Sequence, residues 1–541
     1  MEAERLDTKR SPLWNPRPIL LGAVGALLGG VPALRLEPWV LLVLGGIGLG
    51  AALFLLYKKI YWCLLPLVLG LTLLRGIFLP RDILPEGRYP LSGQIVSLPE
   101  KSREGERVLL GSVQVDGKTY AGTLEVLLPL GTGAEYGDRI SCLAAITPVR
   151  GELVAPKLRG SGEARSKVTV HEGRGSAVYK WVLTLRRQVE RRAETLFAPY
   201  AGEAKGMLLG IKEDISYVSY RAFVQSGLVH LLTVSGLHVG ILCGAVLKLI
   251  RGRRQWLRGL LAGLVLLLYV SLTGFSPSTL RAAIMVFLLF LMRTGVKQED
   301  SLGALSFAFS LLVLWDPRNL TSLGFQLSFG SVWGLYMLTE PLSKALPGRG
   351  NVLWTALCGS LAAALGTLPL LAQTMGEVQW AGIFLSPMVI PVAALFLVPA
   401  WLAIGLHALW PPLGELTAIL PRGVLGYISK AAWLGSSAPL PLPTPGWVSV
   451  ILWYVGLFFL SPYFLPNKKR TPLVGYGFIA ASLLCWLIHA YRGEPPRDFT
   501  GFSGDKGGDV LYTVDICREE KIYEYTGCIG AGHALCRRQR P

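Results

Sequence analysis

"HLLTVSGLHVGIL" runs from His230 to Leu242 and places two histidines, a threonine and a serine inside a segment apolar enough for a lipid bilayer. Polar side chains in hydrocarbon cost free energy unless they find partners. The sequence on either side continues with further long apolar runs. The stretch therefore predicts a membrane helix whose polar groups serve either a function or a contact inside the protein.

The composition excludes an ordinary soluble globular protein. Of 541 residues, 52% are hydrophobic and 16% are charged, against about 25% charged residues in soluble domains. The formal net charge is +18. In a membrane protein such an excess is explained by basic cytoplasmic loops or by binding to an anionic partner. The eight cysteines form no disulfide framework and no CxxC pair.

Apolar runs near the ~20 residues that cross a bilayer predict roughly 11–13 spans. Three come first, at 18–34, 38–57 and 60–79, and basic residues before and between them place residue 80 onward outside. Further spans are expected at 226–249, 256–273, 276–293, 299–315, 325–340, 352–374, 378–411, 446–465 and 471–490. We interpret 378–411 as two short or re-entrant pieces, which must contribute an even number of crossings.

Residues 88–170 have a different pattern, in which apolar and polar residues alternate in short runs broken by Gly and Pro. This pattern predicts a small exported antiparallel β-domain, most simply a five- or six-stranded barrel, with a hairpin turn at Asp116–Lys118. Residues Trp181–Phe197 then change to a helical period with an apolar stripe. We expect an amphipathic helix in the membrane interface, and the alternative is a soluble helix packed on the barrel.

The opening stretch allows several interpretations. Gly236, Gly240 and Gly244 recur every four residues, which on a helix makes a smooth face for close helix packing. His230 and His238 would lie about 12 Å apart along one helix, too far to share a metal ion. Ser235 and His238 share a helix face, so an intramembrane serine hydrolase is an alternative, although no oxyanion loop is evident.

Four longer segments suggest a family. "GMLLGIKEDISYVSYRAFVQSGLVHLLTVSGLHVGIL" at Gly206–Leu242 is followed in order by "LTGFSPSTLRAAIMVFLLFLMR", "SLGALSFAFSLLVLWDPRNLTSLGFQLSFGSVWGL" and "LGTLPLLAQTMGEVQWAGIFLSPMVIP". This series resembles the competence domain of the ComEC-type DNA-uptake family, and the β-domain is similar to that family's N-terminal OB-type domain. The resemblance implies a multi-pass protein of the bacterial cytoplasmic membrane that passes single-stranded DNA during natural transformation. A small-solute transporter is a further alternative.

The resemblance gives the chain an expected domain order. The first spans occupy 1–80, the exported OB-like domain 88–170, the interfacial helices 176–212, the channel domain 213–465, the last span 466–490 and a short exported tail 491–541. Many family members carry a metallo-β-lactamase-like domain, and the tail is similar only to its opening strands. We therefore expect a channel without nuclease activity, cofactor or metal, and a separate nuclease, an outside DNA receptor and a helicase-like motor as partners.

A polyanion needs polar and cationic groups along its path through the membrane. The expected path residues lie in the predicted spans and are His230, Thr233, Ser235, His238, Ser276, Arg281, Gln326 and Ser328. Arg281 follows Gly274 and Pro277, which should bend the helix and free backbone groups toward a cavity. The expected DNA contacts of the β-domain are Lys101, Arg103, Lys118, Arg139 and Lys157.

Overall fold

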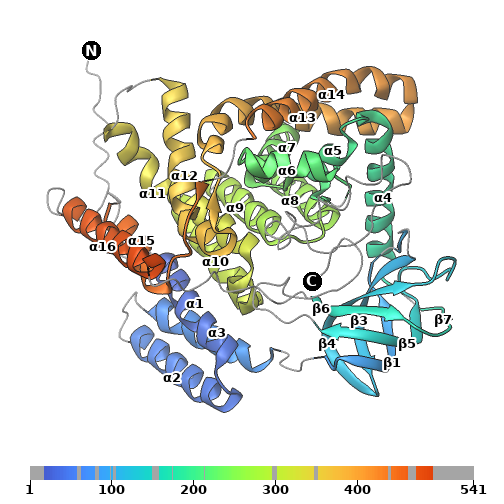
Figure 1. The fold of residues 1–541 in the computed structure, drawn as a ribbon, viewed down its shortest axis with the longest axis horizontal. Helices are drawn as coiled ribbons and strands as arrows, with labels where there is room; N and C mark the ends of the chain where they lie inside the picture. Colours follow the sequence, from blue (N-terminus) through green and yellow to red (C-terminus); the bar gives the residue numbers. More distant parts are fainter. Residues whose placement is uncertain are drawn as a thin grey trace, which may run out of the picture.

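The computed structural model describes residues 18–57, 63–79, 84–97, 99–101, 105–148, 158–173, 175–212, 214–294, 301–345, 351–436, 440–460 and 471–491. In these ranges the chain is mostly helical, with a single β-domain inserted after the third helix. Figure 1 shows this domain at one corner of the molecule, joined by helix α4 to the helices on the opposite side.

The first three helices occupy the predicted spans. They are α1 (Pro18–Arg35), α2 (Pro38–Tyr57) and α3 (Leu64–Ile77), and α3 packs against both of the others. The contact with α2 depends on Gly70, because a Cβ there would lie 2.9 Å from the carbonyl oxygen of Gly45. Small residues thus allow the two backbones to approach closely, as is usual for helices in a membrane.

The β-domain is a closed five-stranded barrel, which confirms the predicted fold class. Its strands are β1 (Gly87–Ile95), β3 (Glu106–Val115), β4 (Lys118–Leu128), β5 (Arg139–Pro148) and β6 (Leu158–Ala164), and they pair in the order β1-β3-β4-β6-β5 with β1 closing on β5. The short β2 (Glu100–Lys101) and β7 (Thr169–His171) pair at the margins. The barrel is of the OB type.

The predicted hairpin turn is also confirmed. The predicted antiparallel pairing of the strands is correct except at one pair. Val115 pairs with Lys118 across Asp116 and Gly117, whose φ angles of 50° and 77° match a two-residue hairpin turn. Strands β4 and β6 pair in parallel. Alternate residues of β5 point into the barrel, among them Ile140, Ala144 and Ile146, and form its apolar core.

Helix α4 (Ala177–Phe197) connects the barrel to the helical part. Lys180 Nζ lies 2.8 Å from Glu135 Oε2 of the barrel, and the rings of Tyr179 and Tyr136 are 5.5 Å apart. At the other end, the guanidinium of Arg422 donates to the carbonyl of Leu196 at 2.6 and 3.0 Å. A cation thus occupies the carboxyl end of the helix, where free carbonyls carry partial negative charge.

The apolar stripe of α4 faces protein, and this corrects the expected contact with lipid. Val182, Val189, Ala193 and Leu196 are buried in a core that also contains residues of α13 and α14. The short helices α5 (Ala201–Leu209) and α6 (Tyr217–Gln225) belong to the same core. An amphipathic pattern shows only that one face of the helix is shielded from water. In this chain the shielding comes from the protein core and not from lipid.

The span expected at 226–249 is wrong, because the chain is broken there. It forms the 3₁₀ turn η2 (Val229–Leu232), an extended link at Thr233–Ser235, and then α7 (Gly236–Leu249). The next helices follow the predicted spans closely: α8 (Gln255–Leu272), α9 (Pro277–Thr294), α10 (Ser301–Trp315), η3 (Pro317–Thr321), α11 (Leu323–Ala345) and α12 (Val352–Met375).

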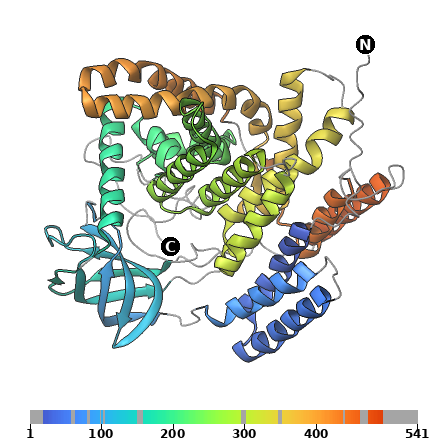
Figure 2. The same cartoon turned by 180° about the vertical axis from the view of Figure 1, so that it is seen from behind.

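The interpretation of 378–411 as two short pieces is also wrong. One helix, α13 (Ala381–Leu409), covers 29 residues despite three internal prolines, and α14 (Pro411–Leu434) returns beside it. Both figures show the two helices side by side (Figures 1 and 2). The ends of this hairpin are held together by strands β8 (Glu377–Val378) and β9 (Leu440–Pro441). The residues that enter and leave this hairpin therefore lie together.

The last helices are α15 (Trp447–Leu460) and α16 (Thr471–Tyr491), which pack on each other. Among the described residues, five helices are long and apolar enough to cross a membrane, and six shorter apolar helices accompany them. The chain is therefore a polytopic helical membrane protein with an inserted OB-like barrel. Residues 492–541, with the predicted exported tail, lie outside the described residues.

The geometry predicts opposite sides of the membrane for two exposed turns. The carboxyl end of α8 is close to α4, since a Cβ at Gly274 would lie 3.5 Å from Arg186 Nη1. Arg253, at the amino end of α8, is separated from that end by about 27 Å along the 18-residue helix. The barrel lies at the amino end of α4 (Figure 1), and Lys118 begins its strand β4.

We expect a cysteine introduced by Lys118→Cys to react with a membrane-impermeant maleimide in spheroplasts, and one introduced by Arg253→Cys to react only in inverted vesicles. Cys517, Cys528 and Cys536 of the predicted exported tail are replaced by serine in both variants. The native Cys142 should contribute little, because it is buried in the barrel and burial raises the pKa of its thiol. Labelling of the Lys118→Cys chain only from the cytoplasmic side would contradict this topology.

Candidate functional site

The predicted path residues gather where two helices begin. Ser278, in the first turn of α9, donates its hydroxyl to the Val234 carbonyl just before α7, at 3.3 Å. The amino end of α7 also meets Arg281, because a Cβ at Gly236 would lie 3.8 Å from Arg281 Nη2. The free N–H groups of a helix start attract anions. Two such starts and one guanidinium therefore lie together.

Ser235 and His238 form the amino-terminal cap of α7. His238 Nδ1 accepts the backbone N–H of Ser235 at 3.0 Å, and the Ser235 hydroxyl lies 2.9 Å from the same nitrogen. The Ser235 hydroxyl is thus within hydrogen-bonding distance of the imidazole, as a serine–histidine dyad requires. The imidazole nitrogen is, however, already used to satisfy a backbone donor of the broken chain, as in a capping box.

His230 and Thr233 satisfy the backbone of the turn before that cap. His230 Nδ1 donates to the Gly227 carbonyl at 3.0 Å, and the Thr233 hydroxyl donates to the His230 carbonyl at 2.8 Å. His230 is exposed while His238 is buried. The break frees backbone groups in an apolar region, and these polar side chains satisfy several of them.

Arg281 is buried, and no carboxylate of the described residues pairs with it. Only 5% of its surface is exposed. Its contacts include the ring of Phe329, whose centre lies 5.6 Å from Cζ, and the sulfur of Met285, 4.0 Å from Nη1. Its Nε has no hydrogen-bond partner among the described residues. Burying an unpaired cation costs several kcal/mol, and a cation–π contact recovers about 2 kcal/mol at best.

Two other cations with little exposure are paired with carboxylates. Lys205 is 3% exposed and its ammonium contacts the carboxylates of Glu194, at 2.8 Å, and Asp214. Arg318 forms a two-pronged pair with Asp316, at 2.8 and 2.9 Å. Arg281 differs from both, because it is buried and no described carboxylate pairs with it. Its environment is suited to receiving an anion from elsewhere.

The structure brings some of the other predicted path residues to this place and not others. Ser276 caps α9, with its hydroxyl 2.6 Å from that of Thr279, one turn before Arg281. Gln326 donates to the Leu320 carbonyl at 2.7 Å, so it serves a local turn on α11. Ser328 is half-buried on the same helix, next to Phe329. The predicted role of each in a path is a proposal and is taken up below.

Within the described chain, only one of the three glycines predicted to form a packing face on α7 has close neighbours, so the packing role of that face stays a prediction. A Cβ at Gly240 or Gly244 would meet nothing within 4 Å in the described structure, and only Gly236 has neighbours, Ala282 and Arg281. The helix after the cap is short and approaches other helices through an adjacent face, where Val239 and Cys243 are buried. Close helix contacts through glycine occur instead elsewhere, as at Gly70.

The expected DNA contacts of the barrel are only partly described. Lys118 lies over the ring of Tyr120, 5.3 Å from its centre, and Arg139 is exposed at the start of β5. Lys101 belongs to β2 and its side chain is not described, and Arg103 and Lys157 lie outside the described residues. Tyr120 packs on the barrel core and Tyr136 contacts α4, so both rings are occupied within the protein.

Two residues of the site were missed in the sequence. Met285 follows Arg281 by four positions, so a helical face of α9 already places them together. Phe329 lies on α11, 48 positions from Arg281, and no local pattern signals their contact. In the described ranges no group of three or more His, Cys, Asp or Glu residues could hold a metal ion.

Comparisons with known proteins place this site within a matched region. Residues 207–466 match the Competence family, described as competence protein. The chain is 31% identical over 226 residues to ComE operon protein 3 of Bacillus subtilis, covering 41% of this chain and 28% of that one. It is 26% identical over 484 residues to competence protein ComA of Neisseria gonorrhoeae, covering 82% and 64%.

An uncharacterised protein of Aquifex aeolicus is 35% identical over 174 residues, which cover 32% of this chain and 40% of that one. The chain therefore spans less than two thirds of the length of each of these relatives. None of the solved structures matches it significantly.

The unpaired state of Arg281 predicts an unusual stability change. Arg281→Met keeps the volume and removes the buried charge, so we expect the free energy of unfolding to rise by about 1 kcal/mol or more. The matched control Arg318→Met leaves Asp316 without its partner and should lower it by about 2 kcal/mol or more. Denaturant unfolding of the two purified variants in detergent measures both values. A clear loss of stability in Arg281→Met would show that the guanidinium is paired.

Proposed function

We propose that this chain, a member of the ComEC-type competence protein family, forms a channel that takes single-stranded DNA across the cytoplasmic membrane during natural transformation. The observation that carries the proposal is the buried, unpaired guanidinium of Arg281 beside the amino ends of α7 and α9. The names of the two competence relatives support a role in competence.

The chemistry of the site fits a phosphodiester. A phosphate oxygen that reaches Arg281 gains a charge-assisted hydrogen bond, and it relieves a cation that has no carboxylate nearby. Backbone N–H groups at the two helix starts add uncharged donors that read no base. Such contacts do not depend on the DNA sequence, as uptake of any strand requires.

His230, Thr233, Ser235, His238 and Ser276 support this place by satisfying the backbone where the helices are interrupted. We assign Gln326 and Ser328 a weaker, bracing role on α11, below Phe329. Interrupted helices with their amino ends at a buried site are a recurrent arrangement in transport proteins that bind anions.

The barrel fits a first contact with the incoming strand. Lys118 and Arg139 are basic residues on its described surface, and OB-type barrels bind single strands through basic grooves. Because Tyr120 and Tyr136 pack inside the protein, we propose that the barrel holds DNA by charge more than by stacking. Lys101, Arg103 and Lys157 would add to that charge.

We propose that the channel moves DNA and leaves its cleavage to another protein. We propose that a receptor delivers DNA from outside, that a separate nuclease prepares the single strand, and that a helicase-like motor draws it inward.

Transformation of a strain that lacks its own channel tests the function. With this chain supplied, we expect uptake to be restored, and Arg281→Ala to lower it about tenfold or more because a charged hydrogen bond is lost. Arg281→Lys should retain part of the uptake, whereas Arg281→Glu should abolish it. The control Arg191→Ala removes an exposed arginine of α4 and should change nothing. Normal uptake with Arg281→Glu, at equal protein level, would contradict the proposal.

A further inference from the structure

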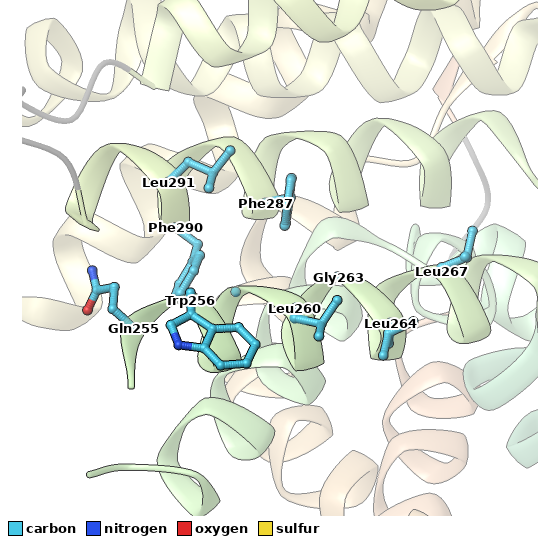
Figure 3. Close-up of a pocket in the computed structure, with 10 residues that line it drawn as sticks. Gln255, Trp256, Leu260, Gly263, Leu264, Leu267, Phe287, Phe290 and Leu291 are labelled. Atoms are coloured by element: carbon cyan, nitrogen blue, oxygen red, sulfur yellow. The ribbon is translucent and has the colours of Figure 1, made fainter. Parts of the chain in front are cut away.

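A groove runs along the outer side of helices α8 and α9, away from the site of Arg281. It has a volume of about 420 Å³ and is almost entirely apolar. Figure 3 shows Trp256, Leu260 and Leu264 on the α8 side and Phe287, Phe290 and Leu291 on the α9 side. Trp256, Leu260 and Leu264 are each more than half exposed.

The groove is shaped by two glycines. A Cβ at Gly259 would lie 3.2 Å from the ring of Phe290, and one at Gly263 would lie 3.4 Å from the ring of Phe287. Without these side chains, the phenylalanine rings of α9 lean onto α8 and the space between the larger residues remains open. The result is a furrow along the helix pair, which suits a flexible hydrocarbon chain.

The groove begins beside a cluster of positive charge. Residues 248–258 read "KLIRGRRQWLR" and contain no acidic residue. Arg251, Arg253 and Arg254 are exposed at the turn between α7 and α8, next to Gln255 and Trp256 at the groove's end. One turn into α8, Arg258 has a buried Nε with no hydrogen-bond partner in the described structure. None of the four is in an ion pair with a described acidic residue.

We propose that this groove binds an anionic phospholipid, with its phosphate at the arginine turn and an acyl chain between α8 and α9. The charge complementarity selects this occupant. The same turn carries the strongest cytoplasmic signal of the chain, and the cytoplasmic leaflet is the one rich in anionic lipid. Trp256 lies between the two parts, at the depth where an amphipathic ring is favoured. The proposal does not depend on the DNA channel.

Native mass spectrometry of the full chain tests the proposal. The protein is released from bilayers that contain phosphatidylglycerol and phosphatidylcholine with the same acyl chains. We expect preferential retention of phosphatidylglycerol, and the preference should fall as salt is raised. This measurement on the unaltered protein needs no variant, and equal retention of the two lipids would overturn the proposal.

Variants then separate the headgroup from the chain. Arg253→Gln together with Arg254→Gln should lower the preference by about fivefold for each charge removed. The matched control, Arg191→Gln with Lys430→Gln, removes two exposed charges from α4 and α14 and should leave it unchanged. Leu264→Trp, which fills the groove, should lower retention of both lipids. If it changes only the oligomer mass, the groove holds a second copy of the chain and the proposal fails.

Discussion

A polypeptide can interrupt its helices inside hydrocarbon only if the freed backbone groups find other partners, and this constraint shapes the centre of the molecule. The chain breaks twice in succession, between η2 and α7 and again between α8 and α9. The side chains of His230, Thr233, His238 and Ser276 satisfy backbone groups beside these breaks. The two breaks bring two helix starts together, and Arg281 is buried beside them.

Two kinds of polar residue therefore lie in this region, and they differ in their effect on the stability of the fold. The capping residues are paired within the chain, so they stabilise the interrupted fold. Arg281 contacts an aromatic ring and a sulfur. These contacts leave most of the free-energy cost of its desolvation uncompensated. A fold that tolerates such a residue loses stability at the site where an anion can restore it. In the proposed channel, the stability lost by burying Arg281 is what favours binding of a phosphate there.

Much of the fold was predictable because apolar length and strand alternation are local. The spans at 38–57 and 352–374 agree with α2 and α12 to within a residue, and the turn at Asp116 was identified by its residues. The break at Thr233–Ser235 was not predicted, because its residues are apolar enough on average to continue a helix. The single helix at Ala381–Leu409 was missed because prolines normally interrupt helices.

The candidate site was predictable only in part. The gathering of polar residues before α7 and α9 could be inferred, since each lies near a glycine, a proline or a capping serine. The contact of Arg281 with Phe329 depends on how α9 and α11 pack, which no local pattern encodes. The packing predicted for Gly240 and Gly244 has no counterpart within the described chain. A glycine repeat shows that close approach is possible and not that a neighbour is present.

Site-specific crosslinking tests the central claim most directly. A photoreactive phenylalanine replaces Phe329, whose ring lies 5.6 Å from Arg281, or Leu335, which is exposed on the same helix α11. Cells taking up labelled DNA are then irradiated. The account predicts DNA crosslinked to the chain altered at position 329 and little at position 335, with the first signal lost when Arg281→Glu is added. Equal crosslinking at both positions, or a signal indifferent to Arg281→Glu, would contradict it.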